Sequence, residues 1–433
     1  MEHTARLTIA LSLVMSAALM GCSDYQLSKI EAHSPEPEPT SGQSSGPIET
    51  PRIGTGGSTS EVPSPWGALE PGQMPEEYFA VAWVDPSETD SYSPPRYDII
   101  DISGQVVSSF SAPEHQSSTN AASWVSHHSL QASGPGRFLA VTSSQAADFY
   151  GPSTYVWSAN GFTGEQEILI SWGPFSENIE LPQAGIQLEL PDWFGLQRIV
   201  ADPHNEDRLF VLTSNTMMYS EPLLGTLYSI HVRDPQAEVL SWDASELISP
   251  DLIPEWVHAP WDPWMLDSFA RGDETVLALG LQFPDEEGGL RTLVAGFSPE
   301  NGPTEWSLDL SDYPFTEEIA MVPSGDEQTT SAVFHQSNDW CPSADFVRWD
   351  GGELTEFSGT DSVYCSSLGP VLDDSAETFI YYGYIDPDLV GAEQRAFISH
   401  RGADVWSYSR FREGLQEHPF EIVDIARLQL EQE

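Results

Sequence analysis

The sequence predicts an all-β chain built from repeated four-stranded units, and three observations support this prediction. From Glu76 onward, short apolar runs alternate with Gly, Pro, Asp and Ser, which is typical of strands joined by tight turns. Pairs of hairpins recur along this region without any long helical periodicity. An apolar segment near the C-terminus, residues 420–427, has no partner of its own and matches a strand that the N-terminal unit lacks.

Each repeated unit contains a first hairpin followed by a second one. The turns of the first hairpins fall at residues 133–136, 202–207, 271–274, 324–327 and 373–377. The turns of the second hairpins fall at Asn160-Gly161, Asp234-Pro235, residues 299–302, Asp350-Gly351-Gly352 and Arg401-Gly402. Four strands per unit, repeated along the chain, predict a β-propeller.

The two chain ends predict how the propeller closes. The N-terminal unit has strands near residues 78–83 and 97–110, and pairing the first of these with residues 420–427 would remove an open sheet edge. We therefore expect a single propeller of six blades with four antiparallel strands each, closed by a C-terminal strand that joins the N-terminal blade. Seven blades are the alternative, if residues 179–190 and 247–257 hide further strands, and a pair of β-sandwiches is a third arrangement.

Four tryptophans fall in the last strand of their units: Trp172, Trp242, Trp306 and Trp406. Large rings at such positions fill the wedge between adjacent blades, so packing is the favoured interpretation and an aromatic binding surface is the alternative.

The N-terminus carries a targeting signal. Arg6 precedes an apolar run, Leu7 to Met20, which is too short to span a bilayer as a helix. The run ends in Leu19-Met20-Gly21-Cys22, which resembles the lipobox of bacterial lipoproteins. The resemblance implies removal of residues 1–21 and diacylglyceryl transfer to the Cys22 thiol, with Ser23 favouring the outer membrane over the inner one. An ordinary signal peptide cleaved near residues 16–18 is the alternative.

Residues 22–74 are rich in Pro, Ser, Gly, Thr and Glu and contain too few apolar side chains to form a core. They predict a disordered tether between the lipid and a propeller domain at residues 75–433.

The charge balance excludes several partners. The formal net charge is −51, and Lys29 is the only lysine. Nucleic acid and direct adsorption to anionic lipid both need positive charge, so neither is expected. Excess acid with almost no lysine resembles proteins from saline habitats, where salt screens the repulsion between carboxylates. A dedicated cation-binding surface is the alternative.

Two cysteines follow the lipobox, Cys341 and Cys365. An exported compartment permits a disulfide between them, which we expect to join neighbouring blades. A metal pair is the alternative, although no CxxC pattern supports it.

The stretch Trp124-Val125-Ser126-His127-His128-Ser129-Leu130 is the sharpest candidate for chemistry. It begins an innermost strand and resembles the His-His-Asp stretch of arylsulfotransferase-like propellers, with Ser129 in place of Asp. The resemblance implies a histidine nucleophile, His127 or His128, with Arg198 holding an anionic group. A polar pair satisfied by the backbone is the favoured alternative.

A second candidate is a loop in which Trp256, Trp261 and Trp264 could stack on a sugar or an aromatic ligand, or could simply cap the domain. No metal or other cofactor is predicted. Acidic clusters such as residues 285–287, and Asp309 with Asp312, could take Ca²⁺ but match no calcium-loop spacing.

These observations predict an exported, lipid-anchored propeller, expected to be monomeric, that acts as a binding module at the cell envelope for an unidentified protein, glycan or small ligand. The alternative is a propeller enzyme that performs group transfer or hydrolysis with a channel histidine.

Overall fold

The computed structural model describes the following parts of the chain: residues 77–84, 95–102, 104–113, 124–145, 153–173, 178–189, 196–214, 224–252, 265–284, 290–310, 316–323, 330–336, 345–350, 353–358, 364–373, 376–384, 394–400, 403–409, 411–412, 415–419 and 421–428. The lipobox and the tether lie outside these residues, so their predicted roles stay predictions. Among the described residues, no helix has the length and apolarity needed to cross a bilayer.

Apart from the C-terminal strand β28, sheets 1 to 3 come from the N-terminal half of the domain. Sheet 1 contains β28 (Glu421–Leu428), β1 (Tyr78–Val84), β2 (Arg96–Asp101) and β3 (Val106–Ser111), in that order. Sheet 2 contains β4 (Trp124–Ala132), β5 (Arg137–Gln145), β6 (Ser153–Asn160), β7 (Gln166–Trp172), β8 (Asn178–Leu181) and β9 (Ile186–Glu189). Sheet 3 contains β10 (Leu196–Asp202), β11 (Asn205–Ser214), β12 (Leu224–His231) and β13 (Leu240–Trp242).

Sheets 4 to 6 follow the same plan. Sheet 4 contains β14 (Met265–Arg271), β15 (Glu274–Pro284), β16 (Leu290–Ser298) and β17 (Gly302–Asp309). Sheet 5 contains β18 (Thr316–Pro323), β19 (Thr330–Gln336), β20 (Asp345–Asp350) and β21 (Glu353–Ser358). Sheet 6 contains β22 (Tyr364–Val371), β23 (Thr378–Tyr384), β24 (Gln394–His400) and β25 (Ala403–Tyr408).

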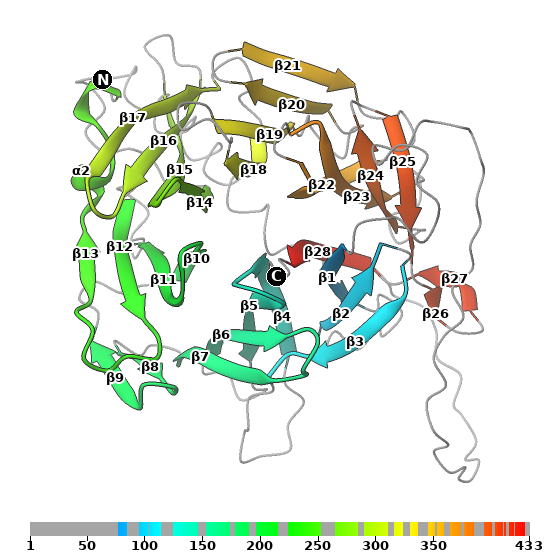
Figure 1. The fold of residues 1–433 in the computed structure, drawn as a ribbon, viewed down its shortest axis with the longest axis horizontal. Coiled ribbons are helices and arrows are strands. Elements are labelled where there is room, and N and C mark those ends of the chain that lie inside the picture. Colours follow the sequence, from blue (N-terminus) through cyan, green and yellow to red (C-terminus); the bar gives the residue numbers. More distant parts are fainter. Residues whose placement is uncertain are drawn as a thin grey trace, which may run out of the picture. The chain divides into compact units, whose positions relative to one another are not determined.

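The sheets are arranged as in a propeller, which confirms the predicted all-β class. The strands nearest the centre are β28, β4, β10, β14, β18 and β22, and each strand contacts the next around the centre (Figure 1). Five sheets have the four strands of a predicted blade, whereas sheet 2 has six strands, so the described strands form five such blades and the prediction of six is wrong.

The predicted pairing of the two chain ends is present. β28 runs antiparallel to β1, with Leu428 opposite Tyr78 and Glu421 opposite Val84. The strand therefore lies at the inner edge of sheet 1, where the sequence pattern lacked a first strand.

The two segments that suggested a seventh blade form no additional blade among the described residues, although the first of them does contain the expected strands. Residues 178–189 form the hairpin β8–β9, which pairs with the end of β7 and so extends sheet 2. Residues 244–252 contain the short helix α2 (Ala244–Leu247) and the 3-10 turn η1 (Pro250–Leu252) instead of a strand. A further small hairpin, β26 (Phe411–Arg412) with β27 (Leu415–Pro419), was not predicted.

The core lies between the sheets. Six clusters of buried apolar side chains are found among the described residues, and each cluster joins two neighbouring sheets. Trp172, Trp242 and Trp306 pack against three of these clusters, which confirms the predicted wedge role for these rings.

Candidate functional site

The two adjacent histidines of the sequence motif lie on β4, the innermost strand of sheet 2. A register shift interrupts the pairing of β4 with β5, since His127 lies opposite Thr142 and Ser129 lies opposite Val141. His128 is therefore the extra residue of a β-bulge, a feature that redirects side chains locally. As a result, the two rings contact different neighbours.

His127 connects sheet 2 to sheet 1. Its Nδ1 lies 3.0 Å from the hydroxyl oxygen of Tyr97, and its Nε2 lies 3.1 Å from a carboxylate oxygen of Asp424 on β28. The His127 side chain is only 6% exposed. A carboxylate accepts hydrogen bonds, so Nε2 carries the hydrogen, and in the neutral ring Nδ1 then accepts from Tyr97.

Tyr97 is suited to donate this bond. Its ring is completely buried and packs edge-on against Trp157, with ring centres 4.9 Å apart. Burial, and then the negative charge of Asp424, raise the pKa of the Tyr97 phenol well above its usual value. The phenol therefore keeps its hydrogen at any physiological pH. Both nitrogens of His127 are consequently engaged, which favours a structural role over nucleophilic attack.

His128 has a different environment. Its Nε2 lies 2.7 Å from the Ser143 hydroxyl and 3.3 Å from the Ser126 hydroxyl. The Ser143 hydroxyl in turn lies 3.1 Å from that of Thr154, so a row of hydroxyl groups crosses β4, β5 and β6. No bond to Nδ1 of His128 is found within the described part of the chain.

The His128 ring is neutral at physiological pH. Although the residue retains surface area, desolvation by the surrounding chain lowers the pKa of its imidazole to about 4, and the charges of His127 and Arg198 add to this effect.

Arg198 lies near the start of β10 and is exposed. Its strand is fixed beside β4 by Gln131, whose amide donates to the Ile199 carbonyl at 2.8 Å and accepts from the Ala201 N–H at 3.5 Å. The structure thus brings Arg198 close enough to His128 to lower its pKa, whereas the predicted role of Arg198 in holding an anionic group stays a prediction.

Replacing Arg198 with alanine is expected to raise the pKa of His128. A guanidinium disfavours a second positive charge nearby, so its removal favours the protonated ring. The pKa should stay below 6.5, because burial is the larger cause. NMR titration of the imidazole protons checks this, with Arg291→Ala as the control, since Arg291 bonds Asp309 at 2.8 Å on sheet 4. If the pKa of His128 is the same in Arg198→Ala as in the wild type, Arg198 does not lie close enough to affect the imidazole.

The same shift has a consequence for stability. The pKa of His128 is lower in the folded protein than in an unfolded chain, so the unfolded chain binds more protons between about pH 6.5 and pH 4. Stability should therefore decrease as the pH falls through this range. His128→Asn is expected to flatten this part of a denaturation-against-pH curve.

Several predicted site residues lie outside the described part of the chain. These are Cys22, Cys341 and the loop tryptophans Trp256, Trp261 and Trp264. Cys365 lies on β22, but the position of its side chain is not described. The predicted disulfide and the predicted stacking surface therefore stay predictions.

The acidic side chains give no metal centre within the described residues, where no cluster of three or more His, Cys, Asp or Glu side chains is close enough to hold an ion. Asp309 accepts a hydrogen bond from Arg291, whereas Asp312 lies outside the described residues.

Sequence reasoning missed three residues. Tyr97 on β2 and Asp424 on β28 hold His127, and Asp267 on β14 is a half-buried carboxyl group whose pKa desolvation raises to about 6. Only Asp424 had a usable signal, since it interrupts an otherwise apolar strand segment at the C-terminus.

Comparisons with known proteins do not assign a family. No family model matches the chain, and no curated protein matches it. Among solved structures, it is similar to an acylaminoacyl peptidase bound to a chloromethyl ketone, with 9% identity and a TM-score of 0.36 over 67% of this chain. It is also similar to the acylaminoacyl peptidase of Pyrococcus horikoshii, with 10% identity and a TM-score of 0.35, again over 67% of this chain. In both cases the matched region spans 42% of the peptidase chain.

Proposed function

We propose that this protein is an exported, lipid-anchored propeller that acts as a binding module at the cell envelope. The anchor rests on the lipobox resemblance at Cys22, and two acyl chains would make attachment stable. In this proposal β4 to β7 serve as the sixth blade of a closed ring, and β8–β9 are an addition to its outer edge. The succession of inner strands from β28 through β22 and back supports that arrangement.

One observation favours binding over catalysis. Tyr97 and Asp424 occupy both ring nitrogens of His127, the more buried of the two candidate nucleophiles. An activated nucleophile needs a free lone pair and a base beside it. His127 has instead the contacts of a residue that fastens sheet 2 to sheet 1.

The binding face that we propose lies where β4 and β10 begin. Arg198 supplies a fixed positive charge, and neutral His128 and the Ser126 hydroxyl supply hydrogen-bonding groups. Positive groups are scarce in this chain, which has 16 lysine and arginine residues against 67 acidic ones. An anionic group, a carboxylate, phosphate or sulfate, is the ligand chemistry that this set fits best.

The test is a thermal-shift titration with inorganic phosphate, sulfate and acetate, repeated at constant ionic strength. We expect stabilisation by at least one anion that is lost in Arg198→Ala and reduced in His128→Ala. Arg291→Ala serves as the matched control and should keep the response. Equal responses in all variants would mean that the anions act only through general screening, and would contradict the site.

Anchoring is tested separately by membrane fractionation of cells that produce the protein. The wild type should partition into detergent, and Cys22→Ser should move to the aqueous phase. A Cys22→Ser protein that still partitions into detergent would contradict the lipid anchor.

A propeller enzyme is the second candidate, because the Ser143 hydroxyl lies 2.7 Å from Nε2 of a neutral His128. A hydroxyl beside an imidazole is the geometry of a nucleophile and its base. However, Ser143 is only 6% exposed and shares its hydroxyl with Thr154. Hydrolysis of activated esters that depends on both Ser143 and His128 would support this candidate.

A further inference from the structure

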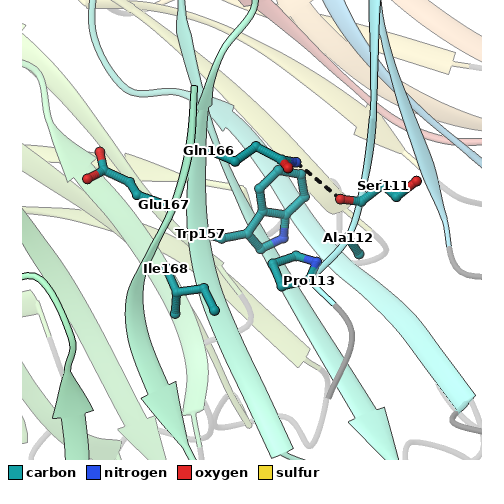
Figure 2. Close-up of a pocket in the computed structure, with 7 residues that line it drawn as sticks. All are labelled: Ser111, Ala112, Pro113, Trp157, Gln166, Glu167 and Ile168. Carbon is teal, nitrogen blue, oxygen red and sulfur yellow. Dashed lines mark hydrogen bonds between the residues drawn. The ribbon is translucent and has the colours of Figure 1, made fainter. Parts of the chain in front are cut away.

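A pocket of about 360 Å³ lies between sheets 1 and 2, and its lining includes neither histidine. It is formed where the end of β3 meets β6 and β7, and Figure 2 shows its lining. The lining residues are Ser111, Ala112, Pro113, Trp157, Gln166, Glu167 and Ile168. The Gln166 amide bridges the two sheets by donating to the Ser111 carbonyl at 3.1 Å.

The pocket contains an unused hydrogen-bond donor. The Trp157 side chain is completely buried, held edge-on by Tyr97 and by Phe138, yet its indole N–H has no acceptor. In Figure 2 the ring nitrogen lies on the side of the indole that faces Ala112 and Pro113. A buried donor without an acceptor is unfavourable, and in native proteins it often indicates a missing partner molecule.

The pocket also contains a hydrogen-bond acceptor, the side-chain carbonyl of Gln166, whose amide nitrogen makes the bond to Ser111. Glu167 contributes to the lining from the same strand, but its carboxylate points away from the pocket and pairs with Arg137 and Arg233 (Figure 2). The rest of the lining includes the apolar side chains of Ala112, Pro113 and Ile168.

These groups favour a ligand that both accepts and donates a hydrogen bond. It must offer an acceptor to the Trp157 N–H, a donor to the Gln166 carbonyl, and a small apolar group.

We propose that this pocket binds a secondary amide group. The amide carbonyl would accept from the Trp157 N–H, the amide N–H would donate to the Gln166 side-chain carbonyl, and an adjoining methyl or methylene would contact Ala112 and Ile168. The same amide chemistry occurs in N-acetylated sugars and in peptides. The site is separate from the proposed anion-binding face, so each can fail without the other.

The test follows the indole N–H signals of the full chain labelled with ¹⁵N-tryptophan. Trp306 provides an internal control, because its indole N–H is also buried without an acceptor but does not line the pocket. The probes are N-acetylglucosamine, N-acetylglycinamide and glucose, which lacks the amide. Trp157→Phe assigns the signal, and contacts to Tyr97 and Phe138 assign it if that variant fails to fold.

We expect the Trp157 signal to shift saturably with at least one amide probe, while the Trp306 signal stays fixed and glucose has no effect. Whichever amide probe binds more tightly identifies the source of the amide. Gln166→Ala should weaken binding several-fold. The proposal is overturned if neither amide probe shifts the Trp157 signal up to the solubility limit of the probe, or if glucose shifts it equally. It is also overturned if the only change at the Trp157 N–H is hydrogen exchange with water.

Discussion

A chain that ends at Phe420, and so lacks β28, is expected to lose its cooperative thermal transition. β28 supplies the inner strand of sheet 1 and pairs with β1 along its length. Four of its apolar side chains are at most 5% exposed: Ile422, Ile425, Ala426 and Leu428. Burial of a large apolar side chain contributes about 1.5–3 kcal/mol, so the strand accounts for much of the ~5–15 kcal/mol that stabilises a domain.

The loss should be visible by calorimetry and by near-ultraviolet circular dichroism. A chain that ends at Leu428 is the matched control, because it keeps every paired residue of β28, and its transition should be unchanged. Adding a synthetic peptide of residues 421–428 to the shorter chain should restore part of the signal. A normal transition in the chain that ends at Phe420 would mean that the terminal pairing does not stabilise the fold.

The sequence was sufficient to predict this pairing because both partners carry local signals. Strands and turns are encoded over a few residues, by apolar runs and by residues such as Gly134 and Gly136, whose positive φ angles of 125° and 65° allow the tight turn between β4 and β5. The N-terminal unit lacked a first strand, and residues 420–427 formed a strand without a partner. Pairing these two was the one arrangement that completed the unit.

The same reasoning could not find the partners of side chains across the seams. Asp424 and His127 are 297 positions apart and meet only because β28 and β4 are neighbours around the centre. The arginines behave similarly. Arg233 on sheet 3 pairs with Glu167 on sheet 2, and Arg348 on sheet 5 pairs with Glu377 beside sheet 6. With 67 acidic residues to choose from, sequence alone could not say which carboxylate each guanidinium would meet.

The second large effect is expected at one of these seams. Asp202 ends β10 and its carboxylate is only 3% exposed. One oxygen accepts from the His204 N–H at 2.9 Å and from the Thr275 hydroxyl of sheet 4 at 2.7 Å. The other oxygen lies 3.4 Å from the Arg208 guanidinium. A single buried group thus holds a turn, a neighbouring sheet and a buried cation.

Asp202→Ala is expected to destabilise the protein by about 2–4 kcal/mol, because it leaves the buried Thr275 hydroxyl and the His204 N–H without their acceptor, while Arg208 keeps Glu300 and Ser229 as partners. In a domain of this size, that corresponds to a decrease in Tm of roughly 3–5 °C. The measurement is denaturant unfolding together with calorimetry.

Asp207→Ala is the matched control, because Asp207 lies in the same strand region and pairs with Arg233, but its side chain is 42% exposed. Solvent-exposed ion pairs contribute about 0–1 kcal/mol, so this variant should unfold close to the wild type. If the two substitutions cost the same, the stability of the seam between sheets 3 and 4 would rest on its apolar cluster alone. If Asp202→Ala loses much more stability than Asp207→Ala, the contribution of an acidic residue to stability depends on how deeply it and its partners are buried. The number of acidic residues near an arginine would then be the smaller factor.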